Sequence, residues 1–362
     1  MAIVHCNNVA IKGIAACVPE HIEDNKTLSL LGGSDEAERF IGTTGVEFRH
    51  TVNGTGLCTS DLCFEAADRL LKELEWGSDE VDCLIFVSQT PDYILPATSC
   101  ILQHRLGLST DCFAIDISLG CSGWVYGLST IASLMASGTM KKGLLLTGDT
   151  TTVTKSPRDK STYPLFGDAG TATALEYTEG SGSIMFHMGT DGKGFDSIMI
   201  PDGGFRNFYN EHSLQIEEVE PGIYRNRLQS ILNGPAVFTF GITKAPRSVN
   251  TLLEHFQLSK DDIDYFVFHQ ANLMMNEKIR SKLKIDPSKV PYSLREYGNT
   301  SSASIPLTIV AELAPVLKTG NHRILASAFG VGLSWASVVF DTTNLVCPDV
   351  ILLNATPKTI PQ

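Results

Sequence analysis

The sequence predicts an α/β protein, because helix-like and strand-like segments alternate along it. The amphipathic segments "DLCFEAADRLLKELEW" and "SVNTLLEHFQLSKDD" have a helical period, and apolar runs follow them, "VDCLIFVSQT" and "IDYFVFHQAN". Continuous apolar runs are typical of strands buried on both faces, as in parallel sheets covered by helices. We therefore expect layers of helices packed on largely parallel sheets.

The same segments predict an internal duplication. The two apolar runs resemble each other and start at Val81 and Ile263, 182 positions apart (263 − 81). A second pair, "GLLLTGD" from Gly143 and "RILASAFG" from Arg323, lies 180 positions apart (323 − 143). Two matches at nearly one offset indicate that about half of the chain is repeated.

The duplication divides the chain into two similar halves. We expect an N-terminal half over residues 1–178 and a C-terminal half over residues 179–345, followed by a surface tail over residues 346–362. A charged and glycine-rich stretch, residues 189–230, is expected to form an excursion or lid-like insertion within the second half.

Composition narrows the classes of partner. The chain has 362 residues, of which 43% are hydrophobic, so a large core is expected. The formal net charge is −12 and no Lys/Arg-rich run occurs, which disfavours nucleic acid as a partner.

The cysteines indicate the cellular location. There are nine, an odd number without a CxxC pair, which indicates reduced thiols and a cytoplasmic protein. The opening "MAIVHCNNVAIKG" does not resemble a signal peptide.

A long uncharged run, residues 117–140, is the strongest candidate for a membrane span. It contains four glycines, five serines and two threonines, which is too polar a composition for a lipid-facing helix. We expect instead a helix buried inside a globular protein, and no membrane span.

Cys121 opens this helix and is the first candidate for chemistry. It lies between the strand-like "CFAIDIS" and the helix-like "WVYGLSTIASLMAS", and the neighbouring Gly120 and Gly123 permit a tight turn. A thiol at the N-terminus of a helix faces the positive end of the helix dipole, which stabilises the thiolate. We interpret Cys121 as a nucleophile. The alternative is a small buried hydrophobe, which we expect for most of the other eight cysteines.

Three segments of the second half supply candidate partners for this cysteine. His269 ends a buried strand, where α/β folds place their sites, although a hydrogen-bonded core histidine is the alternative. Asn299 lies in "YGNTSSASIP" and by itself is typical of a turn or cap. The glycine-rich turn in "SAFGVGLSW" can direct backbone N–H groups at an oxyanion, or it can be a plain hairpin.

Taken together, these motifs resemble β-ketoacyl-acyl-carrier-protein synthase III, a family with the thiolase fold. The resemblance rests on "DISLGCSG", "HQAN", "YGNTSSASIP" and "AFGVGLSW" in this order. It extends to "TPDYILPATSCILQHRLGL" and "GDTTTVTKSPRD", and so covers about residues 10–340. The resemblance implies a thiolase-like fold, in which two duplicated halves form a five-layered αβαβα sandwich, and a homodimer.

The resemblance also implies an activity, a decarboxylative Claisen condensation. Cys121 would hold an acyl group, and His269 and Asn299 would donate hydrogen bonds to the thioester carbonyl of malonyl-acyl-carrier protein. The backbone N–H groups of Cys121 and Val331 would bind the tetrahedral oxyanion. The product would be a 3-oxoacyl-acyl-carrier protein for fatty acid initiation or a specialised lipid or ketide pathway. The substrates would be thioesters of coenzyme A or acyl carrier protein, with no metal and no other cofactor.

The chain departs from the family pattern where substrates bind. Members often have Trp before the "TG" turn and Arg after the "PxD" stretch, where this chain has Arg39 or Phe40 and Lys160. The position that often carries a carrier-binding Arg is Met274. We expect Lys160, with Arg280 and Lys282 in "NEKIRSKLK", to bind the thioester or its carrier. For the last two, the alternative is a solvated helix face. Leu95 matches a position that shapes the acyl pocket across the dimer interface.

Three other functions remain open from the sequence. An acyl-cysteine could transfer its acyl group to an alcohol or amine without decarboxylation. A papain-like cysteine protease also uses Cys, His and Asn in this order, although a parallel α/β second half argues against it. A non-catalytic homologue is the third, against which the intact Cys, His and Asn set argues.

Overall fold

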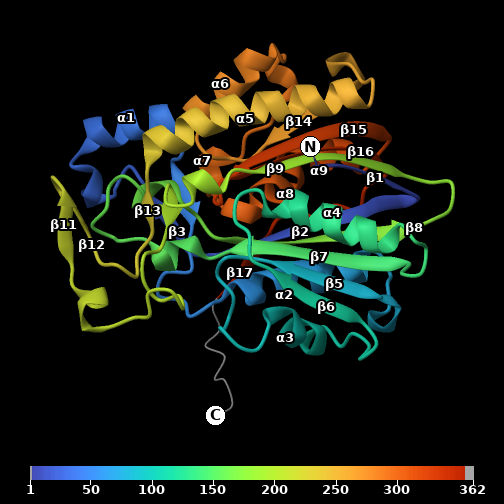
Figure 1. Ribbon diagram of the computed structural model, residues 1–362, viewed down its shortest axis with the longest axis horizontal. Helices are drawn as coiled ribbons and strands as arrows, with labels where there is room; N and C mark the ends of the chain where they lie inside the picture. Colours follow the sequence, from blue (N-terminus) through green and yellow to red (C-terminus); the bar gives the residue numbers. More distant parts are fainter. Residues whose placement is uncertain (1, 355–362) are drawn as a thin grey trace.

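Two β-sheets lie face to face in this protein, with helices between them and outside both (Figure 1). The computed structural model describes residues 2–354. The first sheet has the strand order β17 (Ile351–Leu353), β2 (Val9–Pro19), β8 (Ala169–Tyr177), β7 (Lys142–Asp149), β5 (Cys83–Val87) and β6 (Phe113–Ile117). The second has the order β1 (Ala2–Asn7), β9 (Ser183–Thr190), β16 (Ser334–Thr343), β15 (Asn321–Gly330) and β14 (Tyr265–Phe268).

The helices complete a five-layered αβαβα sandwich. The outer face of the second sheet is covered by α5 (Gly234–His255), against which α6 (Leu273–Leu283) packs. The middle layer contains α4 (Gly123–Met135), α8 (Ser304–Thr308) and α9 (Ala314–Leu317). The outer face of the first sheet is covered by α2 (Thr59–Glu73) and α3 (Thr98–Arg105). Separate apolar clusters fill the middle layer and the two outer interfaces, which confirms the predicted thiolase-like architecture.

The two halves repeat one strand pattern, as the sequence offsets predicted. In the first sheet β5 pairs in parallel with β7, and β7, β8 and β2 follow in antiparallel pairs. In the second sheet β14 pairs in parallel with β15, and β15, β16 and β9 follow in antiparallel pairs. The prediction of largely parallel pairing holds for the first sheet, where three of five strand pairs are parallel, and is wrong for the second, where one of four is. Antiparallel pairs arise where β8 and β16 return through loops without an α-helical crossover. The strands are continuously apolar because helices cover both faces of each sheet.

The ends of the chain cross between the two sheets. Strand β1 joins the second sheet through β9, and β17 joins the first sheet in parallel with β2. Part of the expected surface tail, residues 346–362, is therefore a strand of the first sheet, while residues 355–362 lie outside the described residues. The boundaries at residues 178 and 345 stay predictions.

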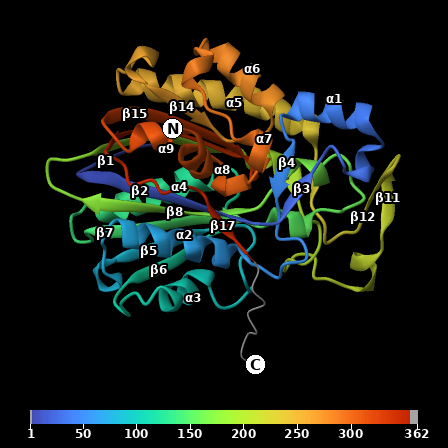
Figure 2. The same ribbon diagram turned by 180° about the vertical axis from the view of Figure 1, so that it is seen from behind.

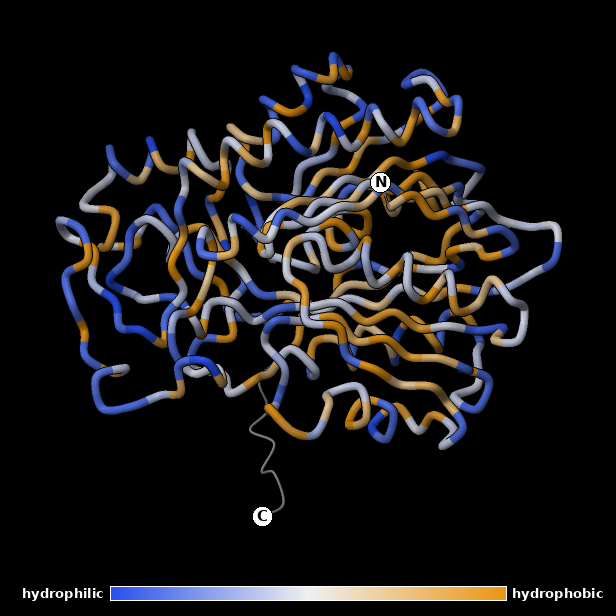
Figure 3. The backbone as a smooth tube through the Cα atoms, in the orientation of Figure 1, coloured by the Kyte–Doolittle hydropathy of each residue, from blue (hydrophilic) through white to orange (hydrophobic). Residues whose placement is uncertain are grey.

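The uncharged run of residues 117–140 forms the buried helix α4. A Cβ atom on Gly127 would lie 2.7 Å from side-chain carbons of both Val87 and Leu145, so the helix has small residues where it touches the first sheet. In Figure 3 the apolar colouring follows the sheets and the helices between them, and the outer loops are mostly hydrophilic. Within residues 2–354, no helix combines the length and apolarity that crossing a bilayer requires.

Smaller elements gather at one end of the sandwich, as Figure 2 shows from behind. They are α1 (Ser34–Thr44), the pair β3 (Ile22–Asp24) and β4 (Phe48–His50), α7 (Leu294–Tyr297), the hairpin β11 (Glu217–Glu220) and β12 (Ile223–Arg225), and the pair β10 (Ile198–Met199) and β13 (Ile231–Leu232). The stretch 189–230 thus contains a hairpin of its own and a short strand, β10, that pairs with β13 just beyond it.

Candidate active site

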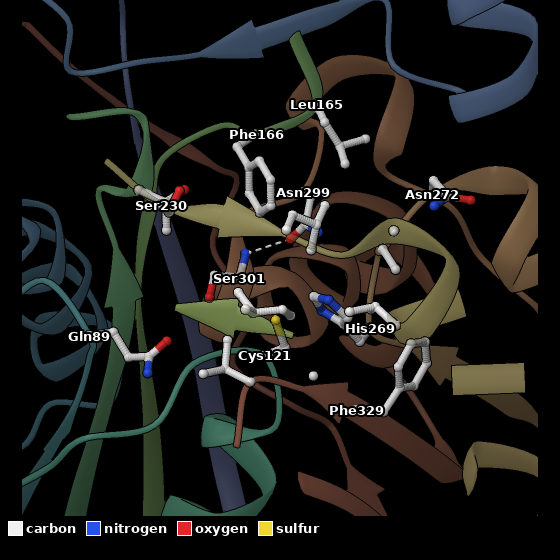
Figure 4. A pocket seen from close by; sticks show the side chains of 18 of the residues that line it. Gln89, Cys121, Leu165, Phe166, Ser230, His269, Asn272, Asn299, Ser301 and Phe329 are labelled. Atoms are coloured by element: carbon white, nitrogen blue, oxygen red, sulfur yellow. Dashed lines mark hydrogen bonds between the residues drawn. The ribbon is translucent and has the colours of Figure 1, made fainter. Parts of the chain in front are cut away.

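The three predicted catalytic residues line one cavity of about 660 Å³. Cys121 comes from the turn between β6 and α4, His269 follows β14, and Asn299 lies in the turn between α7 and α8. Figure 4 shows the three side chains around a common space. Folding therefore brings together the Cys, His and Asn that the sequence places in separate halves.

Cys121 is held in a tight turn at the start of α4. A Cβ atom on Gly123 would lie 2.7 Å from Cγ1 of Val87, so only glycine permits this close approach of the helix to β5. The cysteine is buried, with 8% of its surface exposed. Burial raises the pKa of the Cys121 thiol, and the nearby charge of Asp149 adds to the rise; the backbone N–H of Val331 and the side chain of Ser301 lower it. The pKa of the free thiol is therefore raised, whereas the position of Cys121 at a helix N-terminus had led us to expect a lowered one.

The turn between β15 and β16 touches the sulfur directly. Gly330 ends β15, and a Cβ atom there would lie 2.7 Å from Sγ of Cys121. Val331, the next residue, directs its backbone N–H toward the thiol. The glycine-rich motif is thus part of the cavity wall and not a remote hairpin.

His269 is a buried, neutral imidazole in a fixed orientation. Its Nδ1 lies 2.7 Å from Oγ of Ser304 in α8, and its backbone N–H donates to the carbonyl of Ser327 (2.9 Å). The ring meets Phe329 edge to face at 5.7 Å. Burial lowers the pKa of His269 to about 3, with the backbone of Ser301 opposing the change. The ring therefore carries no charge at neutral pH.

Asn299 presents one end of its amide to the cavity. Its Oδ1 accepts a hydrogen bond from the backbone N–H of Ser301 (2.9 Å), and its own backbone binds Leu165 and Gly167. Because Oδ1 is occupied in this way, Nδ2 is the atom that can donate to a ligand. A turn residue with an occupied oxygen and a free donor suits the binding of a carbonyl oxygen.

A buried carboxylate ties this turn to the first sheet. Asp149, at the end of β7, accepts hydrogen bonds from the backbone N–H of Gln89 (2.7 Å) and from the N–H and hydroxyl of Ser302 (3.1 and 2.7 Å). Sequence reasoning missed Asp149, since a single aspartate after a strand has no distinctive pattern.

Comparison with known proteins identifies the family. The family model described as 3-oxoacyl-(acyl-carrier-protein) synthase III matches residues 115–192, and the model of its C-terminal part matches residues 253–342. A putative 3-oxoacyl-(acyl-carrier-protein) synthase 3 of Campylobacter jejuni is 33% identical over 351 residues, covering 94% of this chain and 96% of the relative. This chain belongs to the 3-oxoacyl-acyl-carrier-protein synthase III family. It is therefore a condensing enzyme, an acyltransferase, and the protease alternative is not supported.

Other relatives agree with this assignment of the synthase. A β-ketoacyl-(acyl-carrier-protein) synthase III of Rhodopirellula baltica is 35% identical over 353 residues, covering 92% of this chain and 98% of the relative. The crystal structure of a 3-oxoacyl-(acyl-carrier-protein) synthase from Burkholderia xenovorans LB400 superposes with a TM-score of 0.91 at 37% identity, covering 97% and 99% of the two chains.

The residues predicted to bind substrate lie away from the catalytic set. Leu95 is 84% exposed and does not line the cavity of its own chain. Lys160 is exposed and also lies outside the cavity lining. On α6, Arg280 binds the carboxylate of Glu277 and a backbone carbonyl, while Lys282 donates to the carbonyl of Ile242. The roles of Leu95, Lys160, Arg280 and Lys282 stay predictions.

Of the residues that depart from the family pattern, only Met274 is in the cavity lining of the described residues. Met274 is about half exposed. Phe40 packs against the small apolar cluster that contains Leu165 and Phe166, whereas Arg39 is exposed. The excursion also contributes to the wall of the synthase through residues 198–200 and Ser230, a role that the sequence did not indicate.

Proposed function

We propose that this synthase condenses an acyl group held on Cys121 with malonyl-acyl-carrier protein, releasing carbon dioxide and a 3-oxoacyl-acyl-carrier protein. The observation that carries the proposal is the meeting of Cys121, His269 and Asn299 in one cavity, where Nδ2 of Asn299 is left to donate to a ligand. Acyl thioesters carry the activated carbonyl themselves, so this chemistry calls for no metal or redox cofactor.

The first step transfers the acyl group to Cys121. Its sulfur attacks the thioester carbonyl, the donor's carbon–sulfur bond breaks, and the thiol proton leaves with the departing thiol. The tetrahedral oxyanion is bound by the backbone N–H groups of Cys121 and Val331, the second of which already points at the sulfur. Because the free thiol has a raised pKa, acylation depends on these donors more than on a preformed thiolate.

The second step uses one tautomer of His269. In this tautomer Oγ of Ser304 accepts from the backbone N–H of Gln270 (3.4 Å) and donates its own proton to Nδ1 of His269. The imidazole proton then resides on Nε2, which donates with Nδ2 of Asn299 to the malonyl thioester carbonyl. Loss of carbon dioxide leaves an enolate that these donors stabilise. The enolate carbon attacks the acyl carbonyl, the bond to sulfur breaks, and Cys121 takes up a proton.

We further propose that the synthase acts as a homodimer. Strand β6 is an edge strand with an apolar sequence, and Phe113 at its start is 39% exposed. Tyr93, Ile94 and Leu95 are exposed together in the loop that follows β5. An edge strand and exposed apolar residues are features that proteins cover by association. Such an interface would let Leu95 reach the acyl pocket of the partner.

The carrier protein and the cellular location complete the proposal. Acyl carrier protein would dock near the cavity mouth through Lys160, Arg280 or Lys282, and coenzyme A or a carrier protein would deliver the starter. All nine cysteines are free in the structure, which supports a reducing, cytoplasmic location.

Intact-mass analysis tests the proposal. The protein is incubated with acyl-coenzyme A and acyl-carrier-protein thioesters, and then with malonyl-acyl-carrier protein. We expect one acyl increment that is lost in Cys121→Ala and kept in Cys100→Ala, an exposed cysteine on α3, followed by a 3-oxoacyl product. Absence of labelling by every thioester would overturn the first step. Labelling without carbon dioxide release would favour acyl transfer to an alcohol or amine.

A further inference from the structure

A buried lysine with no acidic partner lines the cavity beside the catalytic set. Lys155 follows β7, is 8% exposed, and contributes to the cavity wall. Its Nζ donates a hydrogen bond to Oγ of Ser230 (2.7 Å) and lies 4.0 Å from the centre of the Phe166 ring. An ammonium group has three donors, and among the described residues only the one to Ser230 has a hydrogen-bond acceptor.

The carboxylates around Lys155 are bound to other groups. Asp149 is held by Gln89 and Ser302, Asp159 accepts hydrogen bonds from Arg225 and Ser161, and Asp168 accepts hydrogen bonds from Val52 and Thr152. No ion pair within residues 2–354 includes Lys155. The ammonium group of Lys155 therefore has no carboxylate in direct contact, and an entering anion would supply such a partner.

The charge on Lys155 persists at neutral pH. Burial lowers the pKa of Lys155 to about 8, and the negative charge of Asp149, Asp168, Asp159 and, when it is a thiolate, Cys121 opposes the change. These are the titratable groups that act on the ammonium. At neutral pH the ammonium group of Lys155 therefore lies in the cavity wall as a cation. It can lose its proton within the pH range of an ordinary assay.

The position of Lys155 indicates that its ligand is part of the acyl group bound to Cys121. In Figure 4, Ser230 and Gln89 lie on one side of Cys121, and His269 and Phe329 lie on the other. The malonyl carbonyl occupies the His269 side in the proposed reaction. The opposite side remains for the acyl group on Cys121, and the cavity lining includes the polar Gln89, Thr90, Thr151, Thr154 and Ser230.

We propose that Lys155 and Ser230 bind the distal carboxylate of a short dicarboxylic acyl group carried by Cys121. The inference rests on the proposed function, because it requires an acyl-cysteine. The covalent step is unchanged: sulfur replaces the donor thiol at the carbonyl, and the distal carboxylate takes no part. Binding of the malonyl carboxylate by Lys155 instead would stabilise the ground state and oppose its decarboxylation.

Two thioesters of matched shape test whether the cavity selects an acyl group with a distal negative charge. Succinyl and isocaproyl groups differ in that a carboxylate replaces an isopropyl end of similar size. Each is presented on coenzyme A and on acyl carrier protein, and the rate of Cys121 labelling is followed by intact mass. We expect the native protein to prefer succinyl, and Lys155→Met to lose about 10- to 100-fold of this preference. The control is Lys141→Met, an exposed lysine just before the opposite end of β7, which should keep the preference.

A second measurement needs no variant, in case Lys155→Met does not fold. In the native protein, the ratio of succinyl to isocaproyl labelling should fall as pH rises through the titration of Lys155. Ionisation of Cys121 affects both rates alike and cancels in the ratio. A ratio of one or less that neither pH nor Lys155→Met changes would overturn the inference while leaving the acyl-cysteine intact. Failure of all thioesters to label Cys121 would instead overturn the proposed function itself.

Discussion

A methyl group on Gly330 would lie 2.7 Å from the Sγ atom of Cys121, closer than a methyl carbon can approach a sulfur atom to which it is not bonded. In Gly330→Ala, either the thiol or the turn that contains Val331 must move. We expect acylation of Cys121 to slow by about 10²-fold, since displacements of this size disrupt reacting geometry. Single-turnover labelling measures this. Gly42→Ala, in α1 with open space around it, should label at the native rate. Equal rates in the two variants would show that the turn does not hold the nucleophile.

We expect loss of the contact between Ser304 and His269 to affect condensation and not acylation. Ser304→Ala removes the hydroxyl that contacts Nδ1 of His269 and that, in the proposed mechanism, keeps the ring proton on Nε2. Condensation should slow by about 10²-fold, comparable to the loss of one oxyanion donor, whereas acylation of Cys121 should persist. Rapid quench with preacylated enzyme and malonyl-acyl-carrier protein measures the second step alone. Ser337→Ala removes an equally buried serine of β16 from outside the cavity and serves as the control. An equal loss in both half-reactions would contradict this role.

The low pKa of His269 predicts a specific dependence of stability on pH. The pKa is about 3 in the folded protein against an ordinary value of 6.5, so the unfolded chain binds a proton that the native protein does not. The free energy of unfolding should therefore fall as pH drops below about 6.5, by up to about 1.4 kcal/mol per pH unit from this group. In His269→Gln this contribution is absent, and urea unfolding between pH 7.5 and 5 should show a smaller acid loss. Asp168 contributes with the opposite sign, because burial raises its pKa to about 6, but it contributes equally to both proteins. Parallel curves for the two proteins would refute the assignment.

Asp149 ties the turn that contains Ser302 to the first sheet, and we expect Asp149→Asn to affect both stability and catalysis. The side-chain nitrogen that Asp149→Asn introduces cannot accept the hydrogen bonds that Ser302 or Gln89 donates to this carboxylate in the native protein. Loss of such buried partners costs about 3 kcal/mol of unfolding free energy. Condensation should slow as well, because Ser302 belongs to the turn that begins at Asn299. Thermal and urea unfolding, with steady-state rates, are the measurements. Asp111→Asn, at an exposed position, should leave both unchanged.

The sequence was informative where function depends on local structure. The turn before α4, the end of β14 and the turn before α8 each have a short pattern, so Cys121, His269 and Asn299 could be found before their meeting was known. Whether neighbouring strands pair in parallel or antiparallel could not be predicted in this way, because the apolar sequence of a buried strand is the same in both cases. The environment of Lys155 was equally hidden: it depends on Ser230, 75 positions later (230 − 155), and no pattern in "TVTKSPRD" indicates that this lysine is buried.

The crossing of the chain ends has a consequence for synthesis on the ribosome. Strand β1 is synthesised long before its partner β9, which begins at Ser183. The outer edge of β2 stays open until residues 351–353 provide β17. The nascent N-terminal half therefore emerges with an unpaired strand and an open sheet edge, which are the features that invite aggregation. The same crossing of strands that joins the two sheets in the folded enzyme therefore leaves the nascent chain exposed to aggregation. We expect the nascent chain to depend on chaperones, or on rapid synthesis of the missing strands, for protection.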